Sequence, residues 1–409
     1  MTRLIQPDEK GPQLNAPHDR GCGFAPRWRC ALWNRGFRPF YLCAGIFSAF
    51  AIAWWVMQFT GGIQGGDYLR DSLWHAHEMI FGYAFAVVVG FLFTAVRSWS
   101  GRPTPSGRHL ALIVALWLAA RVLLVSGFSV AAAAADVAFA VAAAWGIAVP
   151  LYAGGNRRNL FFVPVLLAIG LANLAFHLAI AGWIDLPVRH MLQVALDLIL
   201  FIMAVVGGRV IPMFTASAVP QAKPRKPKWL EYLALGSLLA LLVTDVLCLP
   251  APLVASCAAI AAIAHGARLA LWQPWHTLRR PILWILHAAY AWIVVHLVLR
   301  TATYWDAGIV NIANHALTVG AIGGLTLGMM TRTARGHTGR PLAAGLAETT
   351  SYLLVQSAAV IRVLVPLCIP SLYLFAIKFS GVLWVAAFML FSVTYAPILW
   401  RPRVDGKPG

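Results

Sequence analysis

Histidines are the residues of this chain whose type and spacing could do metal chemistry. The stretch WHAHEM, from Trp74 to Met79, places His75, His77 and a glutamate directly before an uncharged apolar run. Imidazole is a ligand for zinc, copper and haem iron. The chain has no HExxH zinc-protease motif and no CxxC pair, so copper and haem iron stand ahead of structural zinc.

Six of the twelve histidines are expected near the exterior ends of predicted helices: His75, His77, His177, His190, His296 and His315. Ionisable groups inside a membrane are costly and usually functional, and a low dielectric favours the neutral, ligating imidazole. We therefore predict haem or copper ligands in this layer, with His77 and His315 first and His75 and His190 next. His177 and His296 are weaker candidates. For any single residue, an interfacial histidine bonded to a carbonyl is the structural alternative.

Neighbouring positions add two expectations about how these histidines are used. On a regular helix His75 and His77 are ~200° apart, so they serve two centres, or one orients what the other binds. His190, Gln193 and Asp197 share one helical stripe. Asp197 is thus a candidate partner carboxylate or proton-handling group, with a structural hydrogen bond as the alternative.

Composition identifies an integral membrane protein. Of 409 residues, 60% are hydrophobic and 11% are charged, and the mean hydropathy is +0.74. A membrane-spanning helix needs roughly 20 apolar residues. Twelve continuous runs meet this length and lack the alternation of barrel strands, which predicts an all-α fold of twelve transmembrane helices. The runs are centred near Ser48, Val88, Trp117, Phe139, Leu171, Met203, Leu238, Ile260, Trp292, Gly323, Ala359 and Val385.

The distribution of basic residues predicts the orientation. The net charge is +18, but 25 of the 32 lysines and arginines fall in the N-terminal tail, the even-numbered loops and the C-terminus. By the positive-inside rule these segments and both termini are cytoplasmic, and a nucleic-acid partner is not indicated. Residues 1–36 form a basic tail, and residues 37–409 form the membrane domain.

The second and tenth helices carry similar sequences. His77 begins HEMIFGYAFAVVVGFLFTAVRSWSGRP and His315 begins HALTVGAIGGLTLGMMTRTARGHTGRP, with Gly101 and Gly339 each 24 positions later. The sixth helix also begins at a histidine. This predicts three four-helix repeats, 37–155, 156–280 and 281–405, resembling the haem–copper oxidase core subunit. There are two alternatives to this repeat. The first is chance similarity between apolar segments, and the second is a chain that consists of two six-helix halves, as many carriers do.

Two arginines lie within the predicted membrane region. Arg121 and Arg362 occupy corresponding places on the third and eleventh helices. Buried guanidinium groups need anionic partners. Haem propionates would suit both, as would Asp136, Asp245 or a phospholipid headgroup.

Four segments together resemble the hallmark segments of the NnrS family: GFRPF (36–40), WHAHEMIFGYA (74–84), GGRVIPMFT (207–215) and the run 315–341. The resemblance covers nearly the whole chain after the tail. It implies a twelve-helix protein of the bacterial inner membrane that holds b-type haem and copper. It also implies a link to nitric oxide metabolism, protection against nitrosative stress, and denitrification.

These observations leave competing functions. The first is a haem- and copper-binding membrane protein of the nitric oxide response, which could act as a haem–copper-type oxidoreductase that consumes nitric oxide with an electron donor. The second is a transporter or metal-handling permease that uses the histidine layer as its substrate site. The third is an assembly or signalling partner of a respiratory or denitrification complex. In every case the lipid bilayer is an expected partner.

Overall fold

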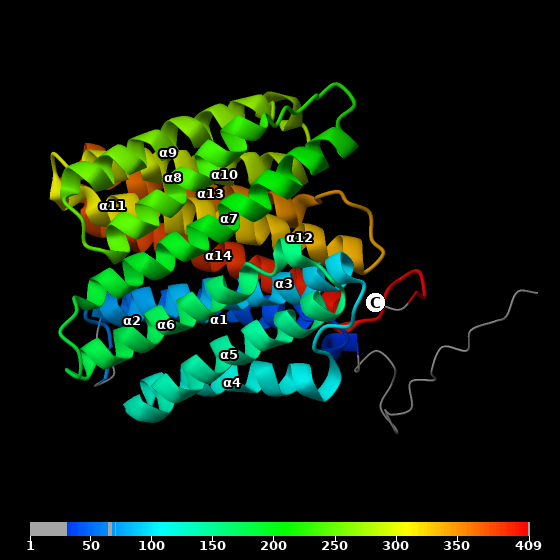
Figure 1. The fold of residues 1–409 in the computed structure, drawn as a ribbon, viewed down its shortest axis with the longest axis horizontal. Helices are drawn as coiled ribbons and strands as arrows, with labels where there is room; N and C mark the ends of the chain where they lie inside the picture. The colour runs from blue at the N-terminus through cyan, green and yellow to red at the C-terminus, as the bar shows by residue number, and fades with distance from the viewer. Residues whose placement is uncertain (1–30, 64–67, 70, 408–409) are drawn as a thin grey trace, which may run out of the picture.

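The fold is a bundle of long helices that run in nearly the same direction (Figure 1). The computed structural model describes residues 31–63, 68–69 and 71–407, so most of the predicted basic tail lies outside the described residues. Twelve helices in the described part are long and apolar enough to cross a membrane, and no strand occurs there, which confirms the predicted all-α class. The α-helices are α1 (Phe37–Phe59), α2 (Asp71–His77), α3 (Phe85–Ser100), α4 (Gly107–Val125), α5 (Ser129–Ala153), α6 (Phe162–Ile180), α7 (Val188–Ala218), α8 (Lys228–Val246), α9 (Ala251–Leu271), α10 (Pro281–Ala302), α11 (Val310–His315), α12 (Gly324–His337), α13 (Leu346–Cys368) and α14 (Tyr373–Trp400).

The second and tenth spans each contain a π-helical segment. The segment η2 (Glu78–Ala84) joins α2 to α3, and η6 (Ala316–Gly323) joins α11 to α12. Each begins directly after a histidine, His77 or His315. Short 3₁₀ segments complete the chain at η3 (Arg157–Asn159), η4 (Pro274–Thr277), η5 (Ala307–Ile309) and η7 (Pro370–Leu372). π-Helical segments are rare in proteins, and those that occur are often found at functional sites.

The same two spans also end alike. Gly101 has φ +65° and Gly339 has φ +75°, the left-handed conformation that glycine adopts at helix ends without steric cost. The paired motifs thus have matching local backbones at both ends. The division into three repeats stays a prediction.

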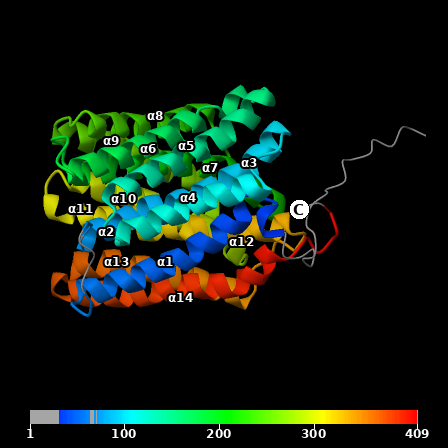
Figure 2. The ribbon, with the colours of Figure 1, turned by 90° about the horizontal axis from the view of Figure 1, so that it is seen from below.

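The second, sixth and tenth spans meet in the middle of the bundle. Side chains of α3, α7 and α12, with Tyr41 of α1, enclose a small apolar cavity of about 70 Å³. Around them, α1 packs on α14 and α14 on α13, while α4 to α6 and α8 to α10 pack in sequence order (Figures 1 and 2). The second and sixth spans, which begin with candidate histidines, are the most deeply buried of the twelve described spans.

The two ends of the bundle differ in what they carry. The helices α2 and α11 lie at one end, and the start of α1 and the C-terminal segment lie at the other (Figure 1). The candidate histidines thus gather at the end opposite the termini. The predicted cytoplasmic side of the termini stays a prediction.

Candidate metal centre

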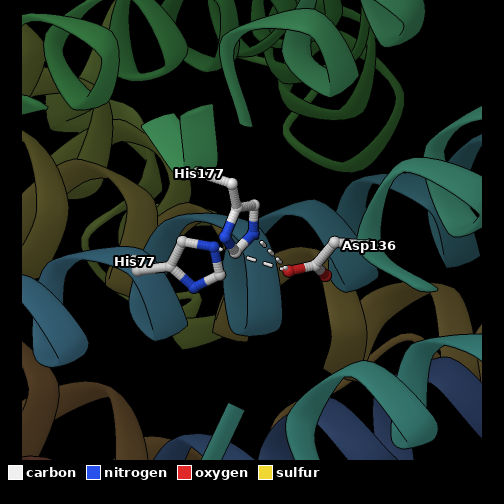
Figure 3. A group of neighbouring side chains, drawn as sticks. All are labelled: His77, Asp136 and His177. Carbon is white, nitrogen blue, oxygen red and sulfur yellow. Dashed lines mark hydrogen bonds and ion pairs between the residues drawn. The ribbon is translucent and has the colours of Figure 1, made fainter. Parts of the chain in front are cut away.

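His77, Asp136 and His177 form a buried group with one ligand atom each, all within 4.8 Å of one another (Figure 3). They come from three elements: the end of α2, α5 and α6. The Nε2 atoms of His77 and His177 lie 3.5 and 3.4 Å from the same oxygen, Oδ2 of Asp136. Exposure is 0% for His77, 3% for Asp136 and 2% for His177, so the group is shielded from water. Two imidazoles and a carboxylate are a donor set for a transition metal.

Further polar groups orient the two imidazoles. His77 Nδ1 lies 3.1 Å from Glu78 Oε1, and its Nε2 lies 2.8 Å from Asn173 Oδ1. His177 Nδ1 lies 2.9 Å from the Tyr68 hydroxyl. Burial, with the nearby Asp136 carboxylate, raises the pKa of Tyr68, which keeps this hydroxyl neutral. Glu78 and Tyr68, the partners of the two Nδ1 atoms, are outer groups of the kind that fix ring orientation in metal sites, whereas Asn173 contacts the Nε2 atom that faces Asp136.

Arg121 of α4 joins the two acidic residues of this region. Its guanidinium donates to Glu78 Oε1 at 2.7 Å and also to Asp136 Oδ1. The structure thus gives Arg121 carboxylate partners, the alternative to the haem propionates that its sequence position also allowed. Two carboxylates against one guanidinium leave a formal charge of −1 with neutral imidazoles. An uncompensated charge is costly in a medium of low dielectric, so the group favours an added cation or proton.

The π-helical segment η2 makes room for this arrangement. A side chain at Gly82 would place its Cβ 2.8 Å from Arg121 Nη1 and 3.0 Å from Glu78 Oε2. The Gly82 carbonyl accepts a hydrogen bond from Trp117 Nε1 of α4 at 2.8 Å. Glycine here therefore permits the close approach of α4 that brings Arg121 to the carboxylates.

A separate, larger cavity of about 590 Å³ lies near the same end of the bundle, and its wall includes His75, His190, His315 and Arg362. The His75 and His315 rings are nearly parallel, at 9°, with centroids 6.4 Å apart. His75 also stacks on Trp55, with ring centroids 4.0 Å apart. The volume falls in the range of ~300–1,000 Å³ that is usual for small-molecule and cofactor sites.

Arg362 differs from Arg121 in its surroundings. Among the described residues no carboxylate forms an ion pair with Arg362, although it is only 5% exposed. Its Nη2 donates to His315 Nε2 at 3.2 Å, and its guanidinium lies 5.3 Å from the Tyr373 ring centroid. His315 Nδ1 in turn donates to the Asn311 carbonyl at 2.6 Å. A buried cation without an anionic partner marks this wall of the cavity as a place for an anionic group.

The remaining two candidates lie outside the His77 group. His190 lines the cavity and has its Nε2 3.4 Å from Cys248 Sγ. His296 is fully buried and donates from Nδ1 to the Ala313 carbonyl at 2.8 Å, which is the structural alternative expected for a single histidine. Its Nε2 has no partner among the described residues.

The six predicted histidines therefore do not form a single site. His77 and His177 converge on one carboxylate, while His75, His190 and His315 face the cavity. His177, a weaker candidate from the sequence, lies beside His77, and local spacing gives no sign of this because its partners come from other helices. Asp136 was predicted only as an arginine partner, and Asn173 was not predicted at all. A lone aspartate in the alanine-rich run 131–144 was the available signal for Asp136.

Comparison with known proteins places the chain in a family. The family model for NnrS protein matches residues 31–403, which is nearly the whole chain. No curated protein matches its sequence. The chain therefore belongs to the NnrS family.

Proposed function

We propose that this chain is a metalloprotein of the bacterial inner membrane that acts in nitric oxide metabolism and protection against nitrosative stress. In the proposal the His77–Asp136–His177 group holds copper, and the cavity lined by His75 and His315 holds haem. The observation that carries the proposal is the convergence of two buried imidazoles on one oxygen of Asp136.

The donor set fits copper. Imidazole nitrogen and carboxylate oxygen both bind copper ions. Arg121 occupies Oδ1 of Asp136, so Oδ2 remains for an ion between the imidazoles. The carboxylate of Glu78 offsets the guanidinium charge, and the residual charge of −1 favours a cation in the group. Glu78 and Tyr68, which contact the Nδ1 atoms of His77 and His177, hold the rings in place.

The cavity fits haem. His75 and His315 would supply imidazoles from the second and tenth spans. Nδ1 of His75 is buried without a partner among the described residues, and Nε2 of His315 would bind iron in place of its present contact with Arg362. Arg362 supplies a cation for a propionate. The apolar lower wall, which includes Ile52, Ile80 and Trp384, suits a macrocycle. These residues bind and orient the group and exclude water.

Nitric oxide is small and apolar, so it enters the bilayer easily. Metal ions held within the membrane region are placed to meet it there. Copper and haem iron, when bound, supply the one-electron redox chemistry that nitric oxide consumption requires. An electron donor from a respiratory or denitrification system completes the proposed activity.

The permease alternative requires a site that opens to each side in turn. Complete burial of His77, with Asp136 and His177 at 3% exposure or less, favours a resident ion. The rate at which bound copper leaves the protein distinguishes the two functions. A resident copper ion stays with the protein during dialysis, whereas a transported ion leaves. Retention of copper after exhaustive dialysis supports the metalloprotein, and its rapid loss would favour the permease.

The test uses paired substitutions in the purified full-length protein. We expect His77→Ala with His177→Ala to remove copper and keep haem, and His75→Ala with His315→Ala to remove haem and keep copper. His109→Ala, at an exposed position of α4, is the matched control and should keep both. Copper is measured by mass spectrometry of the metal, and haem by its visible spectrum. Full copper and haem in both double variants, with normal folding, would overturn the proposal.

A further inference from the structure

Two buried carboxyl groups lie side by side at the wall of the cavity, outside the His77 group. Asp197 of α7 contacts Asp245 of α8, and they are 3% and 6% exposed. Asp245 also lines the cavity. Each carboxyl group has one oxygen in a hydrogen bond and one without a partner among the described residues, Oδ2 in both cases.

The groups around the pair supply one positive charge. Arg300 of α10 donates from Nη2 to Asp245 Oδ1 at 2.5 Å. Gln193 donates from Nε2 to Asp197 Oδ1 at 3.0 Å, and Gln193 is itself held by Asn314 of α11 at 3.0 Å. The nearest histidine on the same stripe of α7 is His190, two turns away, which faces the cavity.

Charge neutrality then requires one further positive charge. With both carboxyl groups ionised the set of Asp197, Asp245 and Arg300 carries −1, and with one proton bound it carries zero. Two like charges in contact in a medium of low dielectric do not both ionise. One proton shared between the two contacting carboxyl groups therefore brings the set to neutrality, and each group has an oxygen without a partner among the described residues to receive it.

A metal cation fits this place poorly. Hard cations such as sodium, magnesium and calcium need about six oxygen ligands. Here two oxygens are free, and the Arg300 guanidinium in contact with Asp245 would repel a cation. A proton needs only the two oxygens that are present.

We propose that Asp197 and Asp245 form a carboxyl pair that binds one exchangeable proton and passes it to and from the cavity. The proton enters and leaves as H⁺, without electron transfer, so the set alternates between zero and −1. Along one stripe of α7, His190 and Gln193 line the cavity and Gln193 contacts Asp197, so the stripe joins the cavity to the pair. This inference rests on the polar wall of the cavity and holds whichever group the cavity binds.

The test is infrared spectroscopy of the purified full-length protein in H₂O and D₂O. The wild type should show the C=O stretch of a protonated carboxyl group, shifted in D₂O because the proton exchanges. Asp197→Asn and Asp245→Asn should each remove the whole band, because the remaining carboxylate is then neutralised by Arg300. Asp306→Asn, which removes an exposed carboxylate, is the matched control and should leave the band unchanged.

The two variants distinguish a shared proton from other arrangements. Persistence of the band in folded Asp197→Asn protein would overturn the proposal, as would its persistence in Asp245→Asn. A band that appears only when sodium is removed would instead indicate a cation site and also overturn it. Thermal unfolding checks that the variants are folded. Copper and haem contents are measured on the same samples, so loss of the proposed cofactors is distinguished from loss of the proton.

Discussion

His75 and His77 are separated only by Ala76, yet their rings belong to different sites. The His75 ring stacks on Trp55 and faces the cavity, while the His77 ring lies between Glu78 and Asn173 in the buried group. The π-helical segment η2 begins directly after them. One short segment therefore links the cavity to the candidate metal centre, and a shift of the segment would move both rings together.

Replacing Arg121 should destabilise the protein strongly. In Arg121→Gln the carboxylates of Glu78 and Asp136 lose their guanidinium, and breaking a buried ion pair costs about 3–5 kcal/mol. Unfolding in detergent, followed by tryptophan fluorescence, measures the change. Arg108→Gln, at an exposed position of the same helix, should change stability by no more than ~0.5 kcal/mol.

A second substitution tests the charge argument for this cluster. Arg121→Gln with Asp136→Asn returns the formal charge of the cluster to −1, so the double variant should be more stable than Arg121→Gln alone. Equal stability of the two would show that charge does not explain the loss.

Replacing Tyr68 should weaken metal binding without removing a ligand. Tyr68→Phe deletes the hydroxyl that lies 2.9 Å from His177 Nδ1. Loss of such an outer partner typically lowers metal affinity about 10–100-fold. Because its pKa is raised above the usual value near 10.0, Tyr68 stays neutral at physiological pH and the effect should not vary from pH 6 to 8. A copper-chelator competition measures the affinity.

The control for this experiment is Tyr304→Phe, which removes an exposed hydroxyl near the same end of the bundle. It should leave copper affinity unchanged. Equal affinities of the Tyr68→Phe and wild-type proteins would contradict an orienting role for the hydroxyl.

Replacing Arg362 should affect haem and leave copper in place. Arg362→Gln removes the positive charge at the cavity wall. Loss of this charge stabilises the oxidised, more positive form of the iron. We therefore expect a lower midpoint potential, by on the order of 60 mV for a tenfold change in the equilibrium, or a reduced haem content. Redox titration followed in the visible spectrum measures it. Lys378→Gln, exposed on α14, is the control, and identical potentials in all three proteins would argue against a propionate at Arg362.

The orientation predicted from the basic residues can be tested by fusion. A reporter that is active only in the cytoplasm should be active when fused to the C-terminus and silent when fused after Thr303, between α10 and η5. The reverse pattern would mean that the histidine end of the bundle faces the cytoplasm.

Much of the fold could be predicted from the sequence, because each span is a local property. Continuous apolar runs predicted the twelve helices. The similar motifs that begin at His77 and His315 lie on spans that both contain a π-segment, which the sequence did not predict. The angular argument also separated His75 from His77 correctly.

The composition of the metal site could not be predicted, because it depends on contacts between distant helices. His77, Asp136 and His177 are brought together by the packing of α5 and α6 on the second span, and no local spacing links them. The ion pairs of Arg121 with Glu78 and Asp136 are equally a property of packing. Arg362, at the corresponding place, has no carboxylate partner among the described residues. Matching sequence positions thus acquired different surroundings.

Anomalous X-ray scattering at the copper absorption edge would locate the copper that we propose among His77, Asp136 and His177. Crystals of the purified, copper-loaded protein should give one strong anomalous peak within bonding distance of both Nε2 atoms and of Asp136 Oδ2. The peak should vanish in crystals of His177→Ala protein. A copper peak located instead beside His75 and His315, or no ordered copper in protein that retains its metal, would contradict the account.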